Sequence, residues 1–447
     1  MSFSPNQGTR LWLRAMPVAI LAAVTLTITG AIARADAPAT TSVPMPTAAT
    51  ALDPVIQWNR VLLGILSTPG AQPATVHATR SLAILHAAIY DAVDSIERTS
   101  KPYLVSIKSP RRADPDAAAA AAGYTVLANL YPSQQETLAA EFASSLASMP
   151  NGYHKFEGVR VGEAVANALL ALRADDGAAT AQPVFVPGTL PGDYQLTPPA
   201  FAQPTFTQWP SVRPFALRTA SQFRPGPPPA LTSKAYTAAF KEVQGLGAVN
   251  STTRTTDQTQ IAQFWNPPIW IAWNNIAETA ALTHPHTLIQ NARLFALLNV
   301  SFADSAIAFY DAKYTYHFWR PVTAIRAADS DGNAATVGDP NWTPLASTAQ
   351  DPSYPGAHAV ISAAASNVLA SFFGSDHIGF SAQSSALPGV ARSFPSFSAA
   401  ANEAAVSRIY AGQHFRTDEV VGQQLGGQVS NYVLHALLLP TRPGGST

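Results

Sequence analysis

The distribution of proline most constrains the fold of this chain. Residues 183–229 contain 12 of the 37 prolines, and a proline inside a helix removes a backbone hydrogen bond and clashes with the preceding turn. On both sides of this stretch apolar residues recur at the three- and four-residue spacing of helices, and the alternation typical of strands is scarce. We therefore expect an all-α protein built from helical bundles, with one long proline-rich connection.

The chain is long enough for a large core, with 447 residues of which 47% are hydrophobic. We expect amino-terminal helices over 51–180, the connection over 183–229 and a catalytic half over 234–440. Interleaved Phe, Trp and Tyr residues indicate that the connection packs on the surface of a single domain, 36–447. A domain boundary inside the connection is the alternative.

The amino terminus has the layout of an export signal. Arg10 and Arg14 precede an apolar run over 16–28, and Ala33-Arg34-Ala35 supplies small residues for cleavage. We expect a signal peptide over 1–35 and a secreted or periplasmic mature protein. A membrane anchor is the alternative, although the run is short for a span of about 20 residues. No later segment is expected to span a membrane.

Charge and cysteine content exclude several function classes. Lys and Arg number 27 and Asp and Glu number 27, so no overall field attracts nucleic acid or an acidic membrane. The absence of cysteine excludes disulfides, thiolate metal sites and thiol nucleophiles. Small-molecule partners are therefore expected, and the ten histidines remain as ligands or acid–base groups.

Two segments carry cations at regular spacing. In "KYTYHFWRP", Lys313 and Arg320 are seven residues apart and would project from one face of a helix. In "SRIYAGQHFRTDEVVG", Arg408 precedes His414 and Asp418, and a carboxylate four residues after a histidine can hold Nδ1–H and leave Nε2 available. Pairing with surface carboxylates, on ordinary surface helices, is the alternative for both segments.

The segment "PSYPGAHAV" places a histidine directly after a tight turn. The Pro355-Gly356-Ala357 turn would bring backbone N–H groups close to a ligand, and His358 could donate a proton. Combined with the three cations and His414, these groups predict a cage for a tetrahedral oxyanion.

The order K-x6-RP, P-S-G-H and S-R-x5-H-x3-D resembles the signature shared by vanadium-dependent haloperoxidases and phosphatases of the type 2 phosphatidic-acid-phosphatase-like (PAP2) superfamily. Upstream, "RSLAILHAAIYDAV" and "IAQFWNPP" are similar to the soluble haloperoxidase-like branch. Here the three blocks read Lys313…Arg320-Pro321, Pro355-Gly356-Ala357-His358 and Ser407-Arg408…His414…Asp418.

The resemblance implies a role for each matching residue. Lys313, Arg320 and Arg408 would hold the oxygens of vanadate or phosphate. His358 would be the acid–base residue. His414 would be the vanadium ligand or, in a phosphatase, the nucleophile that becomes phosphorylated, with Asp418 orienting it.

The activity implied is oxidation of bromide or iodide by hydrogen peroxide with vanadate as cofactor. A PAP2-type acid phosphatase that hydrolyses phosphate monoesters through a phosphohistidine is one alternative, and a non-catalytic phosphate-binding homologue is another. The sequence leaves the oligomeric state open, a homodimer included.

The chain departs from the signature at one block. Gly356-Ala357 stands where the pattern has Ser-Gly, so a hydroxyl is missing from the cage, and we expect Gly356→Ser to raise vanadate affinity. Asp351, seven residues before His358, would disfavour halide approach if it faces the pocket in ionised form. His86 and Asp91 could reach the pocket behind the cage residues, but we expect His86 to be a core residue. His284 and His286 resemble a metal-binding pair, but the proline between them indicates a turn.

Overall fold

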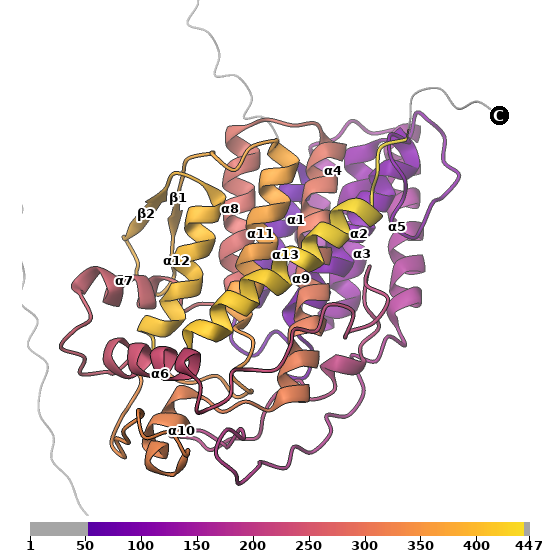
Figure 1. The fold of residues 1–447 in the computed structure, drawn as a ribbon. Coiled ribbons are helices and arrows are strands. Elements are labelled where there is room, and N and C mark those ends of the chain that lie inside the picture. Colours follow the sequence, from indigo (N-terminus) through magenta and orange to yellow (C-terminus); the bar gives the residue numbers. More distant parts are fainter. Residues whose placement is uncertain (1–51, 442–447) are drawn as a thin grey trace, which may run out of the picture. The chain divides into compact units, whose positions relative to one another are not determined.

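The computed structural model describes residues 52–441, which fall within one compact unit. The expected all-α class is confirmed, with one short antiparallel hairpin, β1 paired with β2, as the exception (Figure 1). The signal peptide predicted over 1–35 lies outside the described residues. The elements are α1 (Pro54–Ser67), α2 (Ala78–Glu97), α3 (Pro115–Leu130), α4 (Gln135–Ala147), α5 (Tyr153–Arg173), α6 (Lys234–Leu246), α7 (Thr256–Phe264), α8 (Ile269–Thr283), α9 (Leu288–Tyr316), α10 (Pro321–Arg326), α11 (Ala357–Phe373), β1 (Phe380–Gln383), β2 (Ala391–Phe394), α12 (Phe397–Tyr410) and α13 (Arg416–Ala436), with 3₁₀ turns at Pro132–Gln134, Trp209–Ser211 and Ala328–Ser330.

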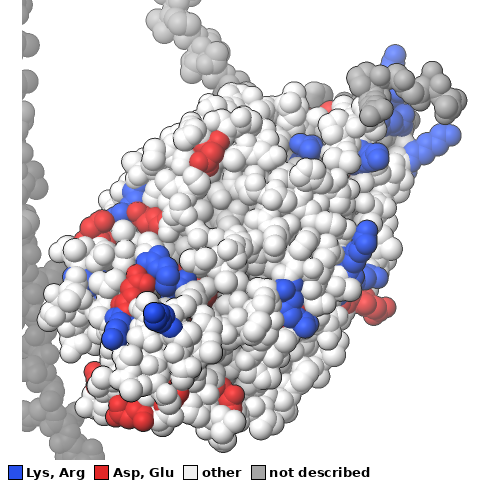
Figure 2. Space-filling view, in the orientation of Figure 1, with Lys and Arg blue, Asp and Glu red and all other residues white. Residues whose placement is uncertain are grey.

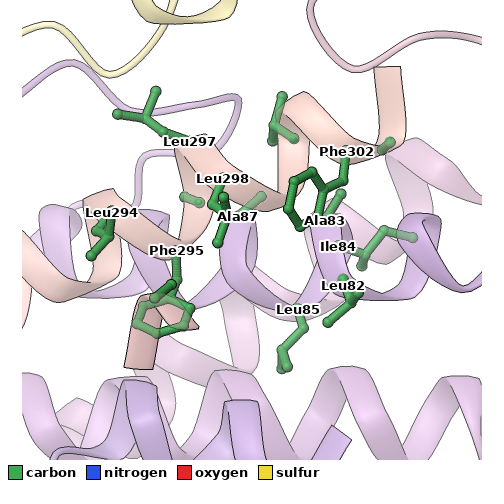
Figure 3. Packing of buried hydrophobic residues seen from close by; sticks show 14 of the residues in the cluster. Leu82, Ala83, Ile84, Leu85, Ala87, Leu294, Phe295, Leu297, Leu298 and Phe302 are labelled. Carbon is green, nitrogen blue, oxygen red and sulfur yellow. The ribbon is translucent and has the colours of Figure 1, made fainter. Parts of the chain in front are cut away.

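Helix α9 is the centre of the core. It contacts α1, α2, α8, α11 and α13, and nearly all of its residues up to Lys313 are buried. Figure 3 shows one of these interfaces, where Ala83 and Ala87 of α2 lie next to Leu298 and Phe302 of α9. Burial on every side explains why this helix has no polar face.

The sequence-based expectation that no later segment is apolar for long enough to span a membrane is wrong for α9. Among the described helices of 18 residues or more, α9 is apolar enough to pass that test. Its most apolar window is 94% buried inside the protein, and the core helix of a soluble bundle has the same composition.

The proline-rich connection has no α-helix within residues 183–229 and is fixed to α9 by a buried carboxylate. Asp304 accepts hydrogen bonds from the backbone N–H groups of Phe215, Ala216 and Leu217 at 2.6, 2.7 and 2.8 Å. Trp209 is also buried against this region. Because the connection cannot satisfy its own backbone groups as a helix would, side chains of α9 do so.

Two glycines allow α13 to lie directly on α11. A Cβ at Gly422 would stand 2.7 Å from the carbonyl oxygen of Gly356, and one at Gly426 would overlap the carbonyl oxygen of Val360. The close approach brings the amino-terminal ends of α11 and α13 together. His358 and Asp418 lie at these two ends.

We predict that Gly426→Ala lowers stability by about 1–3 kcal/mol, because the added methyl group must push the two helices apart. The neighbouring Gly427 has nothing within 4 Å of its Cβ position. Gly427→Ala should therefore leave stability unchanged or raise it by up to about 1 kcal/mol, the helix preference of alanine over glycine. Denaturant unfolding of both variants tests this, and equal effects would contradict the close packing of α11 on α13.

Candidate active site

Five functional side chains come together from the ends of different helices. Lys313 lies near the end of α9, Arg320 directly before α10, His358 at the start of α11, Arg408 near the end of α12, and His414 directly before α13. All five were expected from the sequence. Lys313, Arg320, Arg408 and His414 are at most 4% exposed, and His358 is partly exposed.

Lys313 and Arg320 do not share a helix face, contrary to expectation. Helix α9 ends at Tyr316, and His317 adopts a left-handed conformation with φ of 47° that turns the chain. Arg320 is the residue that caps α10. The two cations meet nonetheless, because the turn folds Arg320 back toward the end of α9, where both side chains contact the same carboxylate.

That carboxylate is Asp351. The Lys313 ammonium donates to Asp351 Oδ1 at 3.1 Å, and Arg320 Nη2 contacts the same oxygen. Arg320 Nε also donates to the Asp351 carbonyl oxygen at 2.8 Å. Burial alone would raise the pKa of Asp351, but the two cations lower it below its usual value, so the group is ionised. Burial lowers the pKa of Lys313 to about 8.

Arg408 is linked to Arg320 through Gln413. Arg320 Nη1 donates to the Gln413 carbonyl oxygen at 2.9 Å, while Arg408 Nη2 contacts Gln413 Oε1. Burial lowers the pKa of Arg408 to about 10, which still leaves it charged at neutral pH. Its Nε has no partner among the described residues although it is buried. The guanidinium can therefore donate one further hydrogen bond to a ligand.

The hydrogen bonds of His414 define its tautomer. Arg320 Nη1 lies 3.0 Å from Nε2, and a guanidinium only donates, so Nε2 must accept and the proton resides on Nδ1. Nδ1 faces Asp418 Oδ2 at 3.3 Å. Burial, followed by the charges of Arg320 and Lys313, lowers the pKa of His414 well below its usual value. A neutral imidazole with a lone pair on Nε2 results.

The sequence predicted that His414 and Asp418 contact each other on one helix face. The contact exists, but His414 precedes α13, and Asp418 lies in the first turn. Asp418 Oδ2 also accepts from the Phe415 N–H at 3.1 Å and from the Ser353 hydroxyl at 2.5 Å. Burial raises the pKa of Asp418 to about 6. The carboxylate thus both caps the helix and orients the imidazole.

His358 lies next to Arg408 through a shared carbonyl. His358 Nε2 is 3.1 Å from the Trp265 carbonyl oxygen, to which Arg408 Nη1 also donates at 3.2 Å. Because a carbonyl only accepts, Nε2 carries the proton and Nδ1 has the lone pair. Burial, followed by the charge of Arg408, lowers the pKa of His358 well below its usual value. This neutral imidazole can accept a proton.

The two backbone N–H groups expected to face a ligand from the Pro-Gly-Ala turn, those of Gly356 and Ala357, differ in their hydrogen bonding. The Gly356 N–H donates to the Asp418 carbonyl oxygen at 3.0 Å, so it is not available to a ligand here, and its expected role is not supported. Ala357 is the first residue of α11, and no partner of its N–H is found within the described part of the chain. Helix amino termini attract anions, which suits this position.

Glu419 is a site residue that the sequence did not indicate. It is 2% exposed, and neither carboxyl oxygen has a hydrogen-bond partner among the described residues. Gln413 and Ser353 were also missed. The one sequence signal was the position of Glu419 directly after the motif residue Asp418. It was easily overlooked, because an acidic residue in the first turn of a helix usually faces solvent. Here it faces Gly356 instead.

The residues weighed and set aside lie elsewhere. His86 stacks on Phe295 with ring centres 5.2 Å apart, and its Nε2 contacts Asn59. Asp91 accepts backbone hydrogen bonds from residues 103–105. His284 ends α8, and His286 packs against Phe372. The expected core position of His86 is confirmed, and Asp91 is buried as well.

The donor set fits a tetrahedral oxyanion such as vanadate. Three buried cations would repel a bare metal cation, but they match the charge of an oxyanion. His414 Nε2 has the lone pair that a vanadium ligand needs, and Arg408 Nε is a buried donor without a partner. The ionised Asp351 opposes an anion, and it is offset by the two cations that it contacts.

Comparison with known proteins agrees with this geometry. A family model described as "VCPO second helical-bundle domain" matches residues 293–439, which include all five side chains. Vanadium chloroperoxidase of Curvularia inaequalis is 25% identical over 403 residues, covering 71% of this chain and 65% of that protein. The match thus spans slightly under two thirds of this relative's length.

Solved structures with similar folds include two bacterial enzymes. The first bacterial vanadium-dependent iodoperoxidase aligns with a TM-score of 0.75 and 26% identity, over 88% of this chain and 97% of that one. A holo-type bacterial vanadium-dependent chloroperoxidase aligns with a TM-score of 0.65 and 16% identity, over 83% and 94% of the two chains, and shows the same fold. The matched domain model, the curated relative and the iodoperoxidase structure together support a relationship to the vanadium-dependent haloperoxidase family.

Proposed function

We propose that this protein is a vanadate-dependent haloperoxidase that oxidises bromide or iodide with hydrogen peroxide. One observation carries the proposal: Lys313, Arg320 and Arg408 are all buried close enough for their charges to act on His414, and Arg320 Nη1 lies 3.0 Å from the unprotonated Nε2. Burying three cations together costs several kcal/mol per ion unless anions compensate. An oxyanion ligand would supply the compensating negative charge. The relatives that share the fold are named for vanadium-dependent halide oxidation.

The residues that would hold vanadate divide into two kinds. His414 Nε2 would bind the vanadium, and the three cations, with the Ala357 N–H at the start of α11, would neutralise the oxygens. Bound vanadate would supply the activation of hydrogen peroxide for a two-electron oxidation of halide. Arg320 must give up its contact with His414 Nε2 when that atom binds a ligand, and its other hydrogen bonds keep its side chain in place.

His358 is the proposed acid–base residue. At neutral pH its Nδ1 has a lone pair, so it can accept a proton from peroxide or water entering the cage. The imidazolium formed can return the proton to a leaving oxygen. Trp265 fixes the ring through its carbonyl oxygen, so that proton transfer needs no reorientation of the side chain.

The charge of Asp351 should affect which halide ions the enzyme can oxidise. An ionised carboxylate inside the cage repels halide ions, and this repulsion acts on all halides alike. Bromide and iodide are easier to oxidise than chloride, so they should remain substrates when the approach of halide is hindered. We therefore propose iodide and bromide, in preference to chloride.

The same cage could act on phosphate esters, which is a second candidate function. A neutral His414 with a lone pair on Nε2 has the form of a nucleophile, and Asp418 holds its Nδ1–H. Phosphoryl transfer requires cations around the equatorial oxygens, which the three basic residues would provide. A phosphohistidine at position 414 would be the covalent intermediate.

Small molecules remain the proposed partners. On the face shown in Figure 2, charged side chains are scattered and most of the surface is uncharged, so this face has no broad basic area for nucleic acid. We also propose export to the periplasm or medium, which rests on the sequence pattern of residues 1–35.

The two histidines should separate binding from turnover. We predict that His414→Ala abolishes vanadate binding, measured by calorimetry, because it removes the atom that would bind the vanadium. His358→Ala should bind vanadate within about threefold of wild type and lose iodide oxidation by roughly a hundredfold or more, since only proton transfer is removed. The exposed His435 offers a neutral control. Equal loss of binding in both variants would contradict these roles.

Asp351→Asn should lower the stability of the ligand-free protein and raise its affinity for vanadate. The buried cations lose their charged partner, so the ligand-free protein should lose about 3 kcal/mol of stability. Vanadate should bind about tenfold more tightly, because a repelling charge is gone, and its binding should restore much of the thermal stability. Calorimetry and thermal unfolding with and without vanadate test both parts. Weaker vanadate binding would show that Asp351 organises the cage rather than opposes its ligand.

Without vanadate, the protein should hydrolyse p-nitrophenyl phosphate slowly, and vanadate should inhibit competitively, because the two oxyanions would share one site. The release of p-nitrophenol at several vanadate concentrations measures this, with His414→Ala as the inactive control. Hydrolysis that persists in His414→Ala, or inhibition that is not competitive, would remove the phosphatase candidate.

A further inference from the structure

Glu419 is a buried acidic residue that neither proposed activity uses. Its side chain is 2% exposed, it belongs to the first turn of α13, and both of its carboxyl oxygens lack hydrogen-bond partners within the described residues. A buried polar group without a partner is costly, and native structures usually have a reason for one. A ligand that completes the hydrogen bonds is such a reason.

The carboxyl group occupies the space next to Gly356. A Cβ at position 356 would lie 2.7 Å from Glu419 Cδ and 2.9 Å from Oε2, and would overlap Oε1. This is the position where the family pattern has a serine. A serine side chain at position 356 and the Glu419 carboxyl group would therefore occupy the same space. This chain has glycine at position 356 and glutamate at position 419, so no such clash arises.

Glu419 also lies beside the other cage residues. Its Oε1 is 3.8 Å from His414 Nδ1, which is too far for a hydrogen bond but places the carboxyl against the imidazole. Arg408 is close enough for its charge to act on Glu419, and Arg408 Nε is itself buried without a partner. Glu419 and Arg408 thus both have buried polar atoms without hydrogen-bond partners among the described residues.

We propose that Glu419 replaces the missing serine, so that its carboxyl group reaches from α13 into the volume beside Gly356 and hydrogen-bonds the bound oxyanion. The inference rests on the oxyanion site proposed above. A carboxylic acid offers one O–H donor, as a serine hydroxyl does.

The expectation that Gly356→Ser alone raises vanadate affinity is therefore revised. The new side chain would have to displace the Glu419 carboxyl, so that one contact is exchanged for another. Restoration of the family arrangement requires two changes, Gly356→Ser together with Glu419→Ala.

Vanadate and inorganic phosphate binding to four proteins tests the exchange. Glu419→Ala should weaken the binding of both oxyanions about ten- to a hundredfold, the effect of losing one hydrogen bond to a charged group. Glu419→Gln should stay within about threefold of wild type, because a carboxamide N–H can donate from the same place. Gly356→Ser/Glu419→Ala should recover most of the loss. Glu136→Gln, at an exposed residue in the first turn of α4, is the matched control.

Several outcomes overturn the inference. Tighter binding in both Glu419→Ala and Glu419→Gln would show a carboxylate that repels the anion. Unchanged binding in Glu419→Ala, or no recovery in the double variant, would show that the side chain only fills space. Thermal unfolding of each variant separates lost binding from lost folding. If the wild-type protein binds neither oxyanion, the proposed function fails. If the wild-type protein binds them and the Glu419 variants bind them equally well, only the inference about Glu419 fails.

Discussion

The burial of Lys313, Arg320 and Arg408 in one place is the constraint on which the rest of the site depends. Taking each cation out of water costs several kcal/mol, and their mutual repulsion adds to this cost. The protein offsets it with Asp351 on two of the cations and with backbone carbonyl oxygens around all three. These partners compensate part of the cost when no ligand is bound, and the cations remain positioned to bind one.

The fold serves this constraint through helix ends. The core holds α9 rigidly, and the site lies where α9 and α12 end and where α10, α11 and α13 begin. Backbone N–H groups at helix starts and carbonyl oxygens of the intervening turns are unsatisfied by the helices themselves, so they can serve buried charges. Gly422 and Gly426 matter because they let α13 carry Asp418 and Glu419 close to the start of α11.

Sequence spacing predicted much of the site but for reasons that were partly wrong. Lys313 and Arg320 were expected together because seven residues make two helical turns, whereas a left-handed residue at His317 brings them together. His414 and Asp418 do contact each other, although only Asp418 is helical. The order of the motif blocks is independent of these details, and for that reason the resemblance named residues that the fold brings together and predicted the all-α fold.

Pairwise sterics could not be predicted from the sequence. Gly356 looked like a lost hydroxyl, because nothing in a linear sequence shows that Glu419, 63 positions later, occupies the vacant volume. Likewise, Asp351 was recognised as a charge, but its contact with Lys313 and Arg320 depends on how two turns fold over the end of α9. Such contacts arise from tertiary packing and have no local sequence period.

The most direct test of the central claim is a crystal structure of the protein soaked with orthovanadate. The account predicts vanadium density bonded to His414 Nε2, with Lys313, Arg320 and Arg408 around its oxygens and with Arg320 Nη1 no longer on the imidazole. Vanadium bound elsewhere, or no vanadium while Arg320 still contacts His414 Nε2, would contradict the claim that these buried cations exist to hold an oxyanion.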